Sequence, residues 1–90
     1  ENVYPAEVEA VLAEHAQIEE AAVVAVPDEQ WGEVGHAYVA TVPGQEVREA
    51  EVLEWLGTRL ARYKQPRRVI QIDELPRTAS GKVQKHRLST

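Results

Sequence analysis

The residues best suited to chemistry are Ser80, Gly81 and Lys82, which follow one another near the end of the chain. Glycine lets a backbone approach an anion closely, and a lysine ammonium group is a cation at neutral pH that donates three hydrogen bonds. Together they could neutralise a negatively charged oxygen of a substrate. A lysine on a loop can also be merely solvated, and these three residues alone leave both interpretations open.

The rest of a phosphate-binding loop of the Walker A type is missing. That motif requires glycine five residues before the Gly-Lys pair, where this chain has Pro76, and Ser or Thr after the lysine, where it has Val83. The chain therefore lacks a self-contained ATP cradle of this type. We expect Lys82 to act on a site that a second domain builds.

Positive charge is concentrated in the final third of the chain. The 90 residues have a formal net charge of −5. Residues 1 to 57 contribute −12, from 13 acidic residues and Arg48, whereas residues 58 to 90 contribute +7, from nine basic residues, Asp73 and Glu74. Such a segment suits a nucleotide, a phosphorylated coenzyme or nucleic acid, unless it is a solvated face that balances acidic helices.

Composition excludes several classes of site. The chain has no cysteine, which excludes disulfides, thiolate nucleophiles and the usual zinc clusters, and His15, His36 and His86 lack metal-ligand spacing. No metal site is therefore predicted in the chain. No run approaches the roughly 18 apolar residues of a membrane span and no secretory signal is visible, so we expect a cytoplasmic protein outside the membrane.

One small domain is expected to position these residues, because 90 residues suffice for one compact domain and not for two. Apolar residues at helical spacing predict one helix from about Pro5 to Ala16 and another from about Arg48 to Arg62. Runs rich in β-branched residues predict strands at residues 21–26, from Gly35 to Val42 and from Arg68 to Asp73. The first of these is nearly all apolar, which suits a strand covered on both faces.

These elements predict an α+β fold in the order α-β-β-α-β-loop-α. Two main helices flank a small three-stranded sheet, whose first two strands are expected to be antiparallel because their connection is short. The loop from Leu75 to Gly81 presents Lys82, and Val83 to Leu88 forms a short C-terminal helix. The residues that shape the loop are Pro76, Thr78, Ser80 and Gly81.

Four motifs follow one another along the chain: Glu1-Asn2-Val3-Tyr4-Pro5-x-Glu7-Val8-Glu9, Pro27-Asp28-x-x-Trp31-Gly32-Glu33, Tyr63-Lys64-x-Pro66, and Leu75-Pro76-Arg77-Thr78-x-Ser80-Gly81-Lys82-Val83-x-Lys85. In this order and spacing they resemble the C-terminal domains of adenylate-forming enzymes. That family includes acyl-CoA synthetases, firefly-luciferase-like enzymes and the adenylation domains of nonribosomal peptide synthetases. The resemblance covers essentially the whole chain.

The resemblance implies that residues 1–90 form a mobile lid, and that a large N-terminal domain outside this chain binds ATP, Mg²⁺ and the carboxylic acid. In such enzymes the acid first attacks ATP to give an acyl-adenylate, and a thiol then displaces AMP. The lysine at the position of Lys82 serves the first step. The lid then rotates about a hinge that lies just upstream of Glu1, and another face helps to form the tunnel for the thiol.

The same resemblance suggests where coenzyme A, the thiol substrate, would bind. An aromatic ring can stack on adenine and basic groups can hold phosphate oxygens, which makes Tyr63, Lys64 and Arg67 candidate contacts. Some acyl-CoA ligases carry a basic residue where this chain has Gln65. Tyr63 could instead cap the core, and Trp31 could either line the tunnel or pack against the domain.

Two alternatives remain. The lid could belong to a peptide-synthetase adenylation domain that acts on the thiol of a carrier protein, although the Tyr63-Lys64 pair and the Ser80-Gly81-Lys82 segment look more like those of coenzyme A ligases. The chain could also be a separate protein- or nucleic-acid-binding module that uses its basic final third. The acidic first part and the five aromatic residues disfavour nucleic acid.

Overall fold

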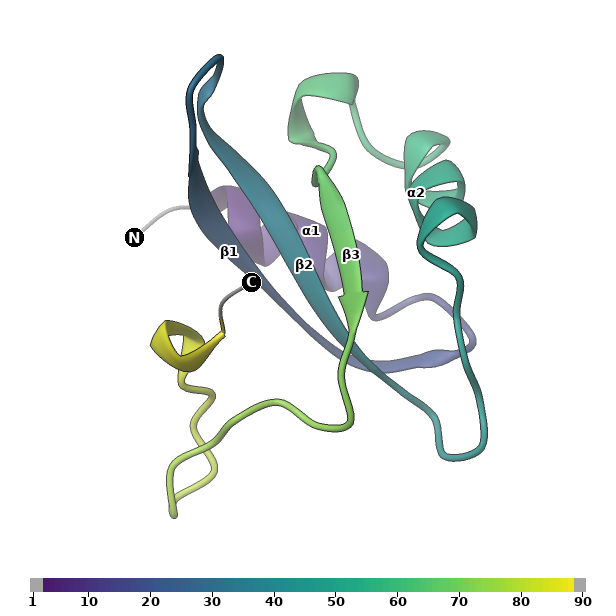
Figure 1. Ribbon diagram of the computed structural model, residues 1–90. Helices are drawn as coiled ribbons and strands as arrows, with labels where there is room; N and C mark the ends of the chain where they lie inside the picture. The colour runs from purple at the N-terminus through teal and green to yellow at the C-terminus, as the bar shows by residue number, and fades with distance from the viewer. Residues whose placement is uncertain (1–2, 89–90) are drawn as a thin grey trace.

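The structure, a computed structural model, describes residues 3–88 and contains two α-helices and one three-stranded sheet (Figure 1). In chain order the elements are α1 (Val3–Leu12), β1 (Ile18–Asp28), β2 (Gly32–Thr41), α2 (Glu49–Gly57), the 3₁₀ turn η1 (Arg62–Lys64), β3 (Arg68–Gln71) and the 3₁₀ turn η2 (Lys85–Arg87). The predicted α+β class and order are confirmed. The short C-terminal helix is a single 3₁₀ turn.

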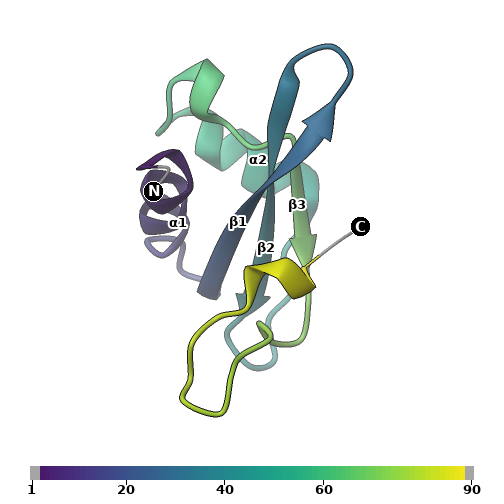
Figure 2. The ribbon, with the colours of Figure 1, turned by 90° about the vertical axis from the view of Figure 1, so that its left-hand side faces the viewer.

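The sheet has the strand order β1-β2-β3 and is mixed. β1 and β2 form the predicted antiparallel pair, whereas β3 lies parallel to β2 because the chain crosses over through α2 between them. Helices α1 and α2 lie on one face of this sheet, and the C-terminal segment with η2 lies over the other (Figure 2).

Each face of the sheet has its own hydrophobic cluster. The larger one joins the sheet to the helices, and its buried members include Val8 and Leu12 of α1 and Val52 and Leu56 of α2. Burying one such side chain stabilises the fold by about 1.5 to 3 kcal/mol. The smaller cluster joins the opposite face to the C-terminal segment; its buried members are Ala22, Tyr38 and Leu75.

The two helices end earlier than predicted. α1 ends at Leu12 rather than Ala16, because the amide groups of residues 14 and 15 bond three residues back and tighten the chain before β1. α2 ends at Gly57 rather than Arg62. There Thr58 donates both its amide and its hydroxyl group to a carbonyl of the last turn, which stops the helix.

The predicted strand at residues 21–26 is longer in the structure, because β1 pairs with β2 along almost its whole length. Ala22 and Val23 are buried on opposite faces, as expected of a strand covered on both sides. Ala25 is exposed, so that expectation fails toward the turn. β3 ends at Gln71, before the predicted Asp73.

Both edge strands have a backbone N–H group that a glutamate from a helix binds. Glu9 of α1 accepts a hydrogen bond from the amide of Val23 at 2.8 Å, and Glu49 of α2 accepts one from the amide of Val69 at 2.9 Å. Unpaired groups at a sheet edge invite pairing with another chain. Each glutamate therefore covers part of an edge while it ties a helix to a strand.

A basic side chain completes each of these edge contacts. The ammonium group of Lys85 lies 2.6 Å from the Glu9 carboxylate, which fastens the C-terminal segment to α1 around the edge of β1. The guanidinium group of Arg68 bonds Glu49 at 2.6 Å. This bond and the backbone amide hold the pKa of Glu49 below its usual value, so its carboxylate is stabilised in the charged form.

Candidate functional site

The segment that carries Lys82 is a tight hairpin rather than an open loop. Residues 75–84, here called the Lys82 hairpin, contain an antiparallel bridge between Arg77 and Val83. The amide of Thr78 donates to the carbonyl of Lys82 at 2.8 Å, and the amide of Gly81 donates to the carbonyl of Thr78 at 2.9 Å. Gly81 has a φ of +93°, which other residues rarely adopt. The backbone next to Lys82 is therefore well defined.

Side chains of the loop residues reinforce this turn. The Thr78 hydroxyl accepts the amide of Lys82 at 3.1 Å and lies 3.0 Å from the Ser80 hydroxyl, while the carbonyl of Pro76 accepts the amide of Gln84 at 2.8 Å. Lys82 itself is exposed. Its ammonium group makes no ion pair or hydrogen bond with the part of the chain from residue 3 to 88. The hairpin thus presents an exposed cation on an ordered support.

The second set of predicted residues comes together in one groove of about 1220 Å³, here called the aromatic groove. Trp31, Tyr63, Lys64 and Arg67 all line it. Tyr63 is 82% exposed and Trp31 is 62% exposed, so Tyr63 does not cap the core and Trp31 does not pack inside the domain. Two large aromatic side chains therefore face the same open groove.

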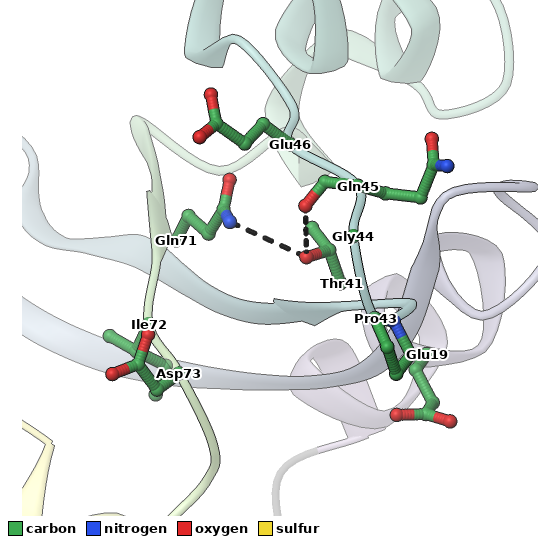
Figure 3. A pocket seen from close by; sticks show the side chains of 9 residues that line it. All are labelled: Glu19, Thr41, Pro43, Gly44, Gln45, Glu46, Gln71, Ile72 and Asp73. Atoms are coloured by element: carbon green, nitrogen blue, oxygen red, sulfur yellow. Dashed lines mark hydrogen bonds between the residues drawn. The ribbon is translucent and has the colours of Figure 1, made fainter.

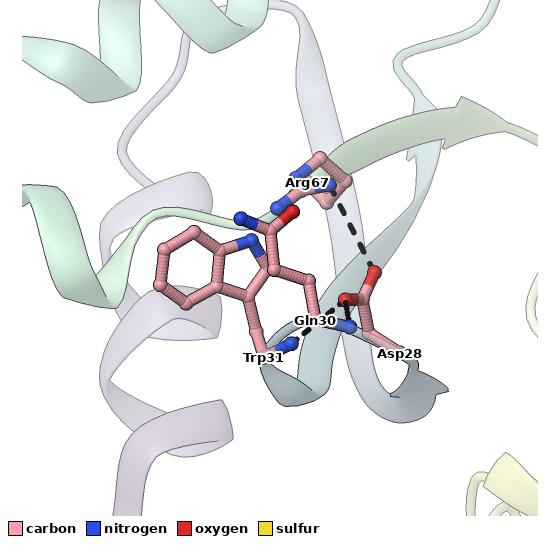
Figure 4. Close-up of polar contacts among 4 residues, drawn as sticks. All are labelled: Asp28, Gln30, Trp31 and Arg67. Carbon is pink, nitrogen blue, oxygen red and sulfur yellow. Dashed lines mark hydrogen bonds and ion pairs between the residues drawn. The ribbon is translucent and has the colours of Figure 1, made fainter.

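Asp28 builds the turn that carries Trp31 (Figure 4). One oxygen of its carboxylate accepts the amide groups of Gln30 and Trp31, each at 2.9 Å, and the other lies 3.9 Å from Arg67. The amide of Trp31, followed by that of Gln30, holds the pKa of Asp28 below its usual value. The carboxylate therefore fixes the turn and joins it to the segment that enters β3.

Lys64 is less available than its position in the groove suggests. Its ammonium group lies 3.0 Å from the carboxylate of Glu7 on α1, and this hydrogen bond raises the pKa of Lys64. The pair fastens η1 to α1. Sequence reasoning missed Arg62, which also lines the groove. The position of Arg62 in the same basic segment as Arg67 could have indicated it, but only the 3₁₀ turn brings both side chains to one groove.

The Lys82 hairpin and the aromatic groove lie at opposite ends of the domain. In Figures 1 and 2 the hairpin is at the lower end, whereas the β1–β2 turn and η1 are at the upper end. The longest dimension of the domain is 35 Å. The structure therefore brings the nucleotide-contact candidates together and keeps Lys82 apart from them.

A profile of the family described as AMP-binding enzyme C-terminal domain matches residues 7–82. The chain belongs to this family. The candidate residues Trp31, Tyr63, Lys64 and Arg67 of the aromatic groove fall inside the matched range, as does the hairpin up to Lys82. The four motifs in the sequence had predicted this membership, which is now confirmed.

Curated relatives of this AMP-binding enzyme C-terminal domain are much longer than the chain. An indoleacetate–CoA ligase of Aromatoleum aromaticum is 52% identical over 85 residues, which are 94% of this chain and 17% of that protein. A feruloyl-CoA synthase of an Amycolatopsis species is 51% identical over 85 residues, again 94% of this chain and 17% of that protein. The chain thus spans about one sixth of the length of the relatives it matches.

Solved structures have the same fold as this AMP-binding enzyme C-terminal domain. ATP-bound MatB from Rhodopseudomonas palustris superposes with a TM-score of 0.88 at 41% identity, over 96% of this chain and 17% of that one. The o-succinylbenzoate CoA synthetase of Bacillus subtilis, in complex with an acyl-adenylate intermediate, gives 0.87 at 41% identity, over 100% of this chain and 18% of that one.

A second, polar hollow of about 430 Å³ lies where β2 leads into α2 (Figure 3). The hydroxyl group of Thr41 donates to the carbonyl of Gln45 at 2.7 Å, and the side-chain oxygen of Gln71 accepts the amide of Val47 at 3.1 Å. The hollow contains acidic side chains from Glu19, Glu46 and Asp73. Its hydrogen bonds connect the β2–α2 segment to β3, which is a structural role.

The described part of this AMP-binding enzyme C-terminal domain contains neither a cluster of metal ligands nor a membrane-spanning helix. Between residues 3 and 88, no group of three or more His, Asp or Glu side chains is placed to hold a metal ion. No helix in the described part of the domain is both long enough and apolar enough to cross a bilayer.

Proposed function

We propose that this domain is the mobile lid of an ATP-dependent acyl-CoA synthetase. Lys82 serves the activation of a carboxylic acid by ATP, and the aromatic groove serves the later transfer of the acyl group to coenzyme A. The names of the relatives support the reaction class, because they are CoA ligases and CoA synthetases. In this proposal the sites for ATP and the acid lie in a large N-terminal domain.

The separation of the two candidate sites carries the proposal. A rigid domain cannot present both the Lys82 hairpin and the aromatic groove to one reaction centre at the same time, because they occupy opposite ends (Figure 1). A rotation of the whole domain exchanges one end for the other, which is a known kind of domain movement. Two half-reactions at one centre would use these two ends in turn.

Lys82 contributes electrostatic stabilisation in the first half-reaction. The carboxylate of the acid attacks the α-phosphate of ATP, the acyl-adenylate forms and pyrophosphate leaves, so the negatively charged oxygens of two groups, the carboxylate and the α-phosphate, must approach each other. The exposed ammonium group of Lys82 would bind these oxygens and orient the nucleophile. Removing one such donor typically costs about 3 to 4 kcal/mol of barrier.

The aromatic groove suits the nucleotide end of coenzyme A. Tyr63 is exposed and can stack on adenine, while Arg62 and Arg67 can hold phosphate oxygens. Lys64 would join them only by leaving Glu7. Trp31 then lies where it can line the path of the thiol.

Mg²⁺, which this family of reactions implies, does not fit the described residues, because no group of three or more His, Asp or Glu side chains between residues 3 and 88 is placed to hold it. It would therefore belong to the large domain. The nucleic-acid alternative loses support from the charge pairing. All five ion pairs within residues 3–88 join a base of the final third to an acid of the first part: Lys64 with Glu7, Arg67 with Asp28, Arg68 with Glu49, Arg77 with Glu20 and Lys85 with Glu9.

The decisive variant is Lys82→Ala in the full-length enzyme. Acyl-adenylate formation, measured by ATP–pyrophosphate exchange, should fall by about 10² to 10³-fold. Thioester formation from supplied acyl-adenylate should stay near the wild-type rate. Tyr63→Ala is the matched variant at the other end, and it should impair the second half-reaction while sparing the first.

An equal loss of both half-reactions in Lys82→Ala would contradict the proposed role of the lysine. The alternative is the lid of a peptide-synthetase adenylation domain, for which the thiol of a carrier protein replaces coenzyme A as the acyl acceptor. Supplying the acyl-adenylate with either coenzyme A or a phosphopantetheine-bearing carrier protein distinguishes the two. Transfer to the carrier alone would favour the peptide-synthetase class.

A further inference from the structure

One guanidinium group connects the backbone beside Lys82 to the sheet. Nη1 of Arg77 donates a hydrogen bond of 2.7 Å to the carbonyl of Gly81, the residue directly before Lys82. Nη2 of the same side chain pairs with the carboxylate of Glu20 on β1. Arg77 therefore spans its own hairpin and reaches the strand beneath it.

A β-bulge places Glu20 on the correct face for this contact. Ile18 pairs with Thr41 and Glu20 pairs with Ala40, so β1 has one extra residue, Glu19, at this point. Side chains two apart normally share a face of a strand. Here Ile18 packs in the cluster under the helices, whereas Glu20 meets Arg77 beside the hairpin, because the extra residue shifts the alternation.

From this geometry we propose that Glu20 and Arg77 are positioning residues for Lys82 in the acyl-adenylate-forming step. The inference rests on the proposed function. Glu20 orients the guanidinium group of Arg77, and Arg77 fixes the carbonyl of Gly81. Together they set the direction in which the hairpin delivers the ammonium group of Lys82, and neither residue touches the substrate.

Arginine suits this task better than lysine. Its planar guanidinium group offers separate donors in a fixed geometry, so one side chain can bind a carbonyl and a carboxylate at once. A lysine at position 77 has a single ammonium group on a flexible stem. Arg77→Lys should therefore keep the charge while it loses the fixed geometry.

The exposure of the Arg77–Glu20 ion pair makes it possible to distinguish a positioning role from a role in stability. The Arg77 and Glu20 side chains are 40% and 37% exposed. Exposed ion pairs contribute little to stability, whereas a small misplacement of a catalytic group can greatly reduce a rate. Loss of the pair should thus slow the adenylation step while thermal unfolding changes little.

The test uses the full-length enzyme with Arg77→Ala, Arg77→Lys, Glu20→Gln and Glu20→Ala. The kcat of ATP–pyrophosphate exchange should fall about tenfold in Arg77→Ala, because a displacement near 1 Å of a catalytic group can cost up to about 10²-fold. Glu20→Ala, Glu20→Gln and Arg77→Lys should each show part of this loss. The KM for ATP and thioester formation from supplied acyl-adenylate should stay at wild-type values.

Two variants provide matched controls. Arg87→Ala removes the same charge from the same C-terminal segment; within residues 3–88 the Arg87 side chain bonds only the nearby Gln84. Glu19→Ala removes the neighbouring carboxylate of β1, which makes no hydrogen bond or ion pair within residues 3–88. Both controls should leave both half-reactions unchanged. The double variant Glu20→Ala with Arg77→Ala should be no slower than Arg77→Ala alone, because both changes break the same chain of contacts from Glu20 through Arg77 to the Gly81 carbonyl.

Three results would overturn the proposal. The first is pyrophosphate exchange in Arg77→Ala as fast as in Arg87→Ala. The second is an equal loss of both half-reactions in Arg77→Ala together with a lower unfolding temperature. The third is a double variant whose rate loss equals the product of the losses in Glu20→Ala and Arg77→Ala. Lys82→Ala, measured alongside, separates this failure from that of the proposed function. Normal exchange in Lys82→Ala overturns both, whereas loss of exchange there with normal exchange in Arg77→Ala overturns only the positioning role.

Discussion

The two ends of this domain share a local device and differ in how they are supported. Lys82 follows Gly81, whose φ is +93°, and Trp31 precedes Gly32, whose φ is +80°. Each of these candidate side chains therefore stands beside a glycine that closes a tight turn. The difference lies in what surrounds the turn.

At the hairpin end, side chains bond the turn itself and fasten it to β1. The Arg77 guanidinium group binds both the Gly81 carbonyl and Glu20, so the backbone beside Lys82 is fixed to β1. At the groove end, Trp31 and Tyr63 leave most of their surface exposed beside an open groove. One end thus presents a point charge and the other presents a surface, which suits a small reaction centre and a larger ligand respectively.

The largest effects on stability should come from alanine at the two turn glycines, where open space surrounds each position and only the backbone is strained. Gly81→Ala and Gly32→Ala should each destabilise the domain by about 1 to 2 kcal/mol, the cost of a left-handed conformation with a Cβ atom. Their activities should differ: on the proposed function, Gly81→Ala should slow acyl-adenylate formation and Gly32→Ala should slow thioester formation. Calorimetry and the two half-reaction assays measure both effects.

Gly44→Ala is the control for this pair. Gly44 has a φ of +82° and open space around it, but it lies in the connection between β2 and α2, outside both the Lys82 hairpin and the aromatic groove. It should lose the same stability without preference for either half-reaction. If all three variants affected the two steps alike, the functional division between the ends would be wrong.

A smaller effect is expected from Asp28→Asn at the groove end. The lowered pKa of Asp28 means that the folded state favours its carboxylate, so this stabilisation is present above the usual pKa of 3.8 and disappears as the pH falls through the folded-state value. At neutral pH the Trp31 turn of the wild type should exchange its amide hydrogens more slowly than that of the variant. The difference should vanish under acid conditions.

Hydrogen–deuterium exchange of the turn, compared between the two proteins at each pH, measures this effect. Glu33→Gln changes a charge on the same turn without touching these hydrogen bonds and serves as the control. Acyl-adenylate formation should be normal in both variants. Equal protection of the wild type and Asp28→Asn at neutral pH would remove Asp28 as the organiser of the groove end.

The smallest effect is expected from Glu7→Gln. The Glu7 carboxylate neutralises Lys64, so removing its charge should free the lysine for a phosphate group and lower the KM for coenzyme A by about two- to threefold, within the energy of an exposed ion pair. Glu14→Gln removes the same charge just beyond α1 and should change nothing. A KM that rises in Glu7→Gln would mean that Lys64 supports η1 and does not contact the ligand.

Local patterns predicted most of the fold. The apolar residues at helical spacing, such as Val8 and Leu12, are buried as expected, and the runs of β-branched residues form the three strands. The segment from Leu75 to Gly81 was predicted as a loop, and the structure shows a hydrogen-bonded hairpin there. Helix ends were less predictable, because Thr58 stops α2 through hydrogen bonds that no periodicity reveals.

The sequence predicted which residues form the candidate site but did not predict how they are arranged in space. Tyr63, Lys64 and Arg67 lie close in sequence, and their association in one groove required little more than η1. Trp31 joins them only because β2 and the segment entering β3 are neighbours, as the bond from the Arg67 amide to the Gly35 carbonyl at 2.7 Å shows. The engagement of Lys64 by Glu7 could not be predicted, since 57 positions separate them.

The sequence by itself determined the polarity of charge, the turns and the side chains available for chemistry. Composition and short-range pattern suffice for these, because they act over a few residues. Tertiary structure alone decided that the basic final third is largely paired with the acidic first part, that a bulge turns Glu20 toward Arg77, and that Lys82 and the aromatic groove lie at opposite ends. The reason is physical: strand register and packing on the two faces of the sheet set which distant side chains meet.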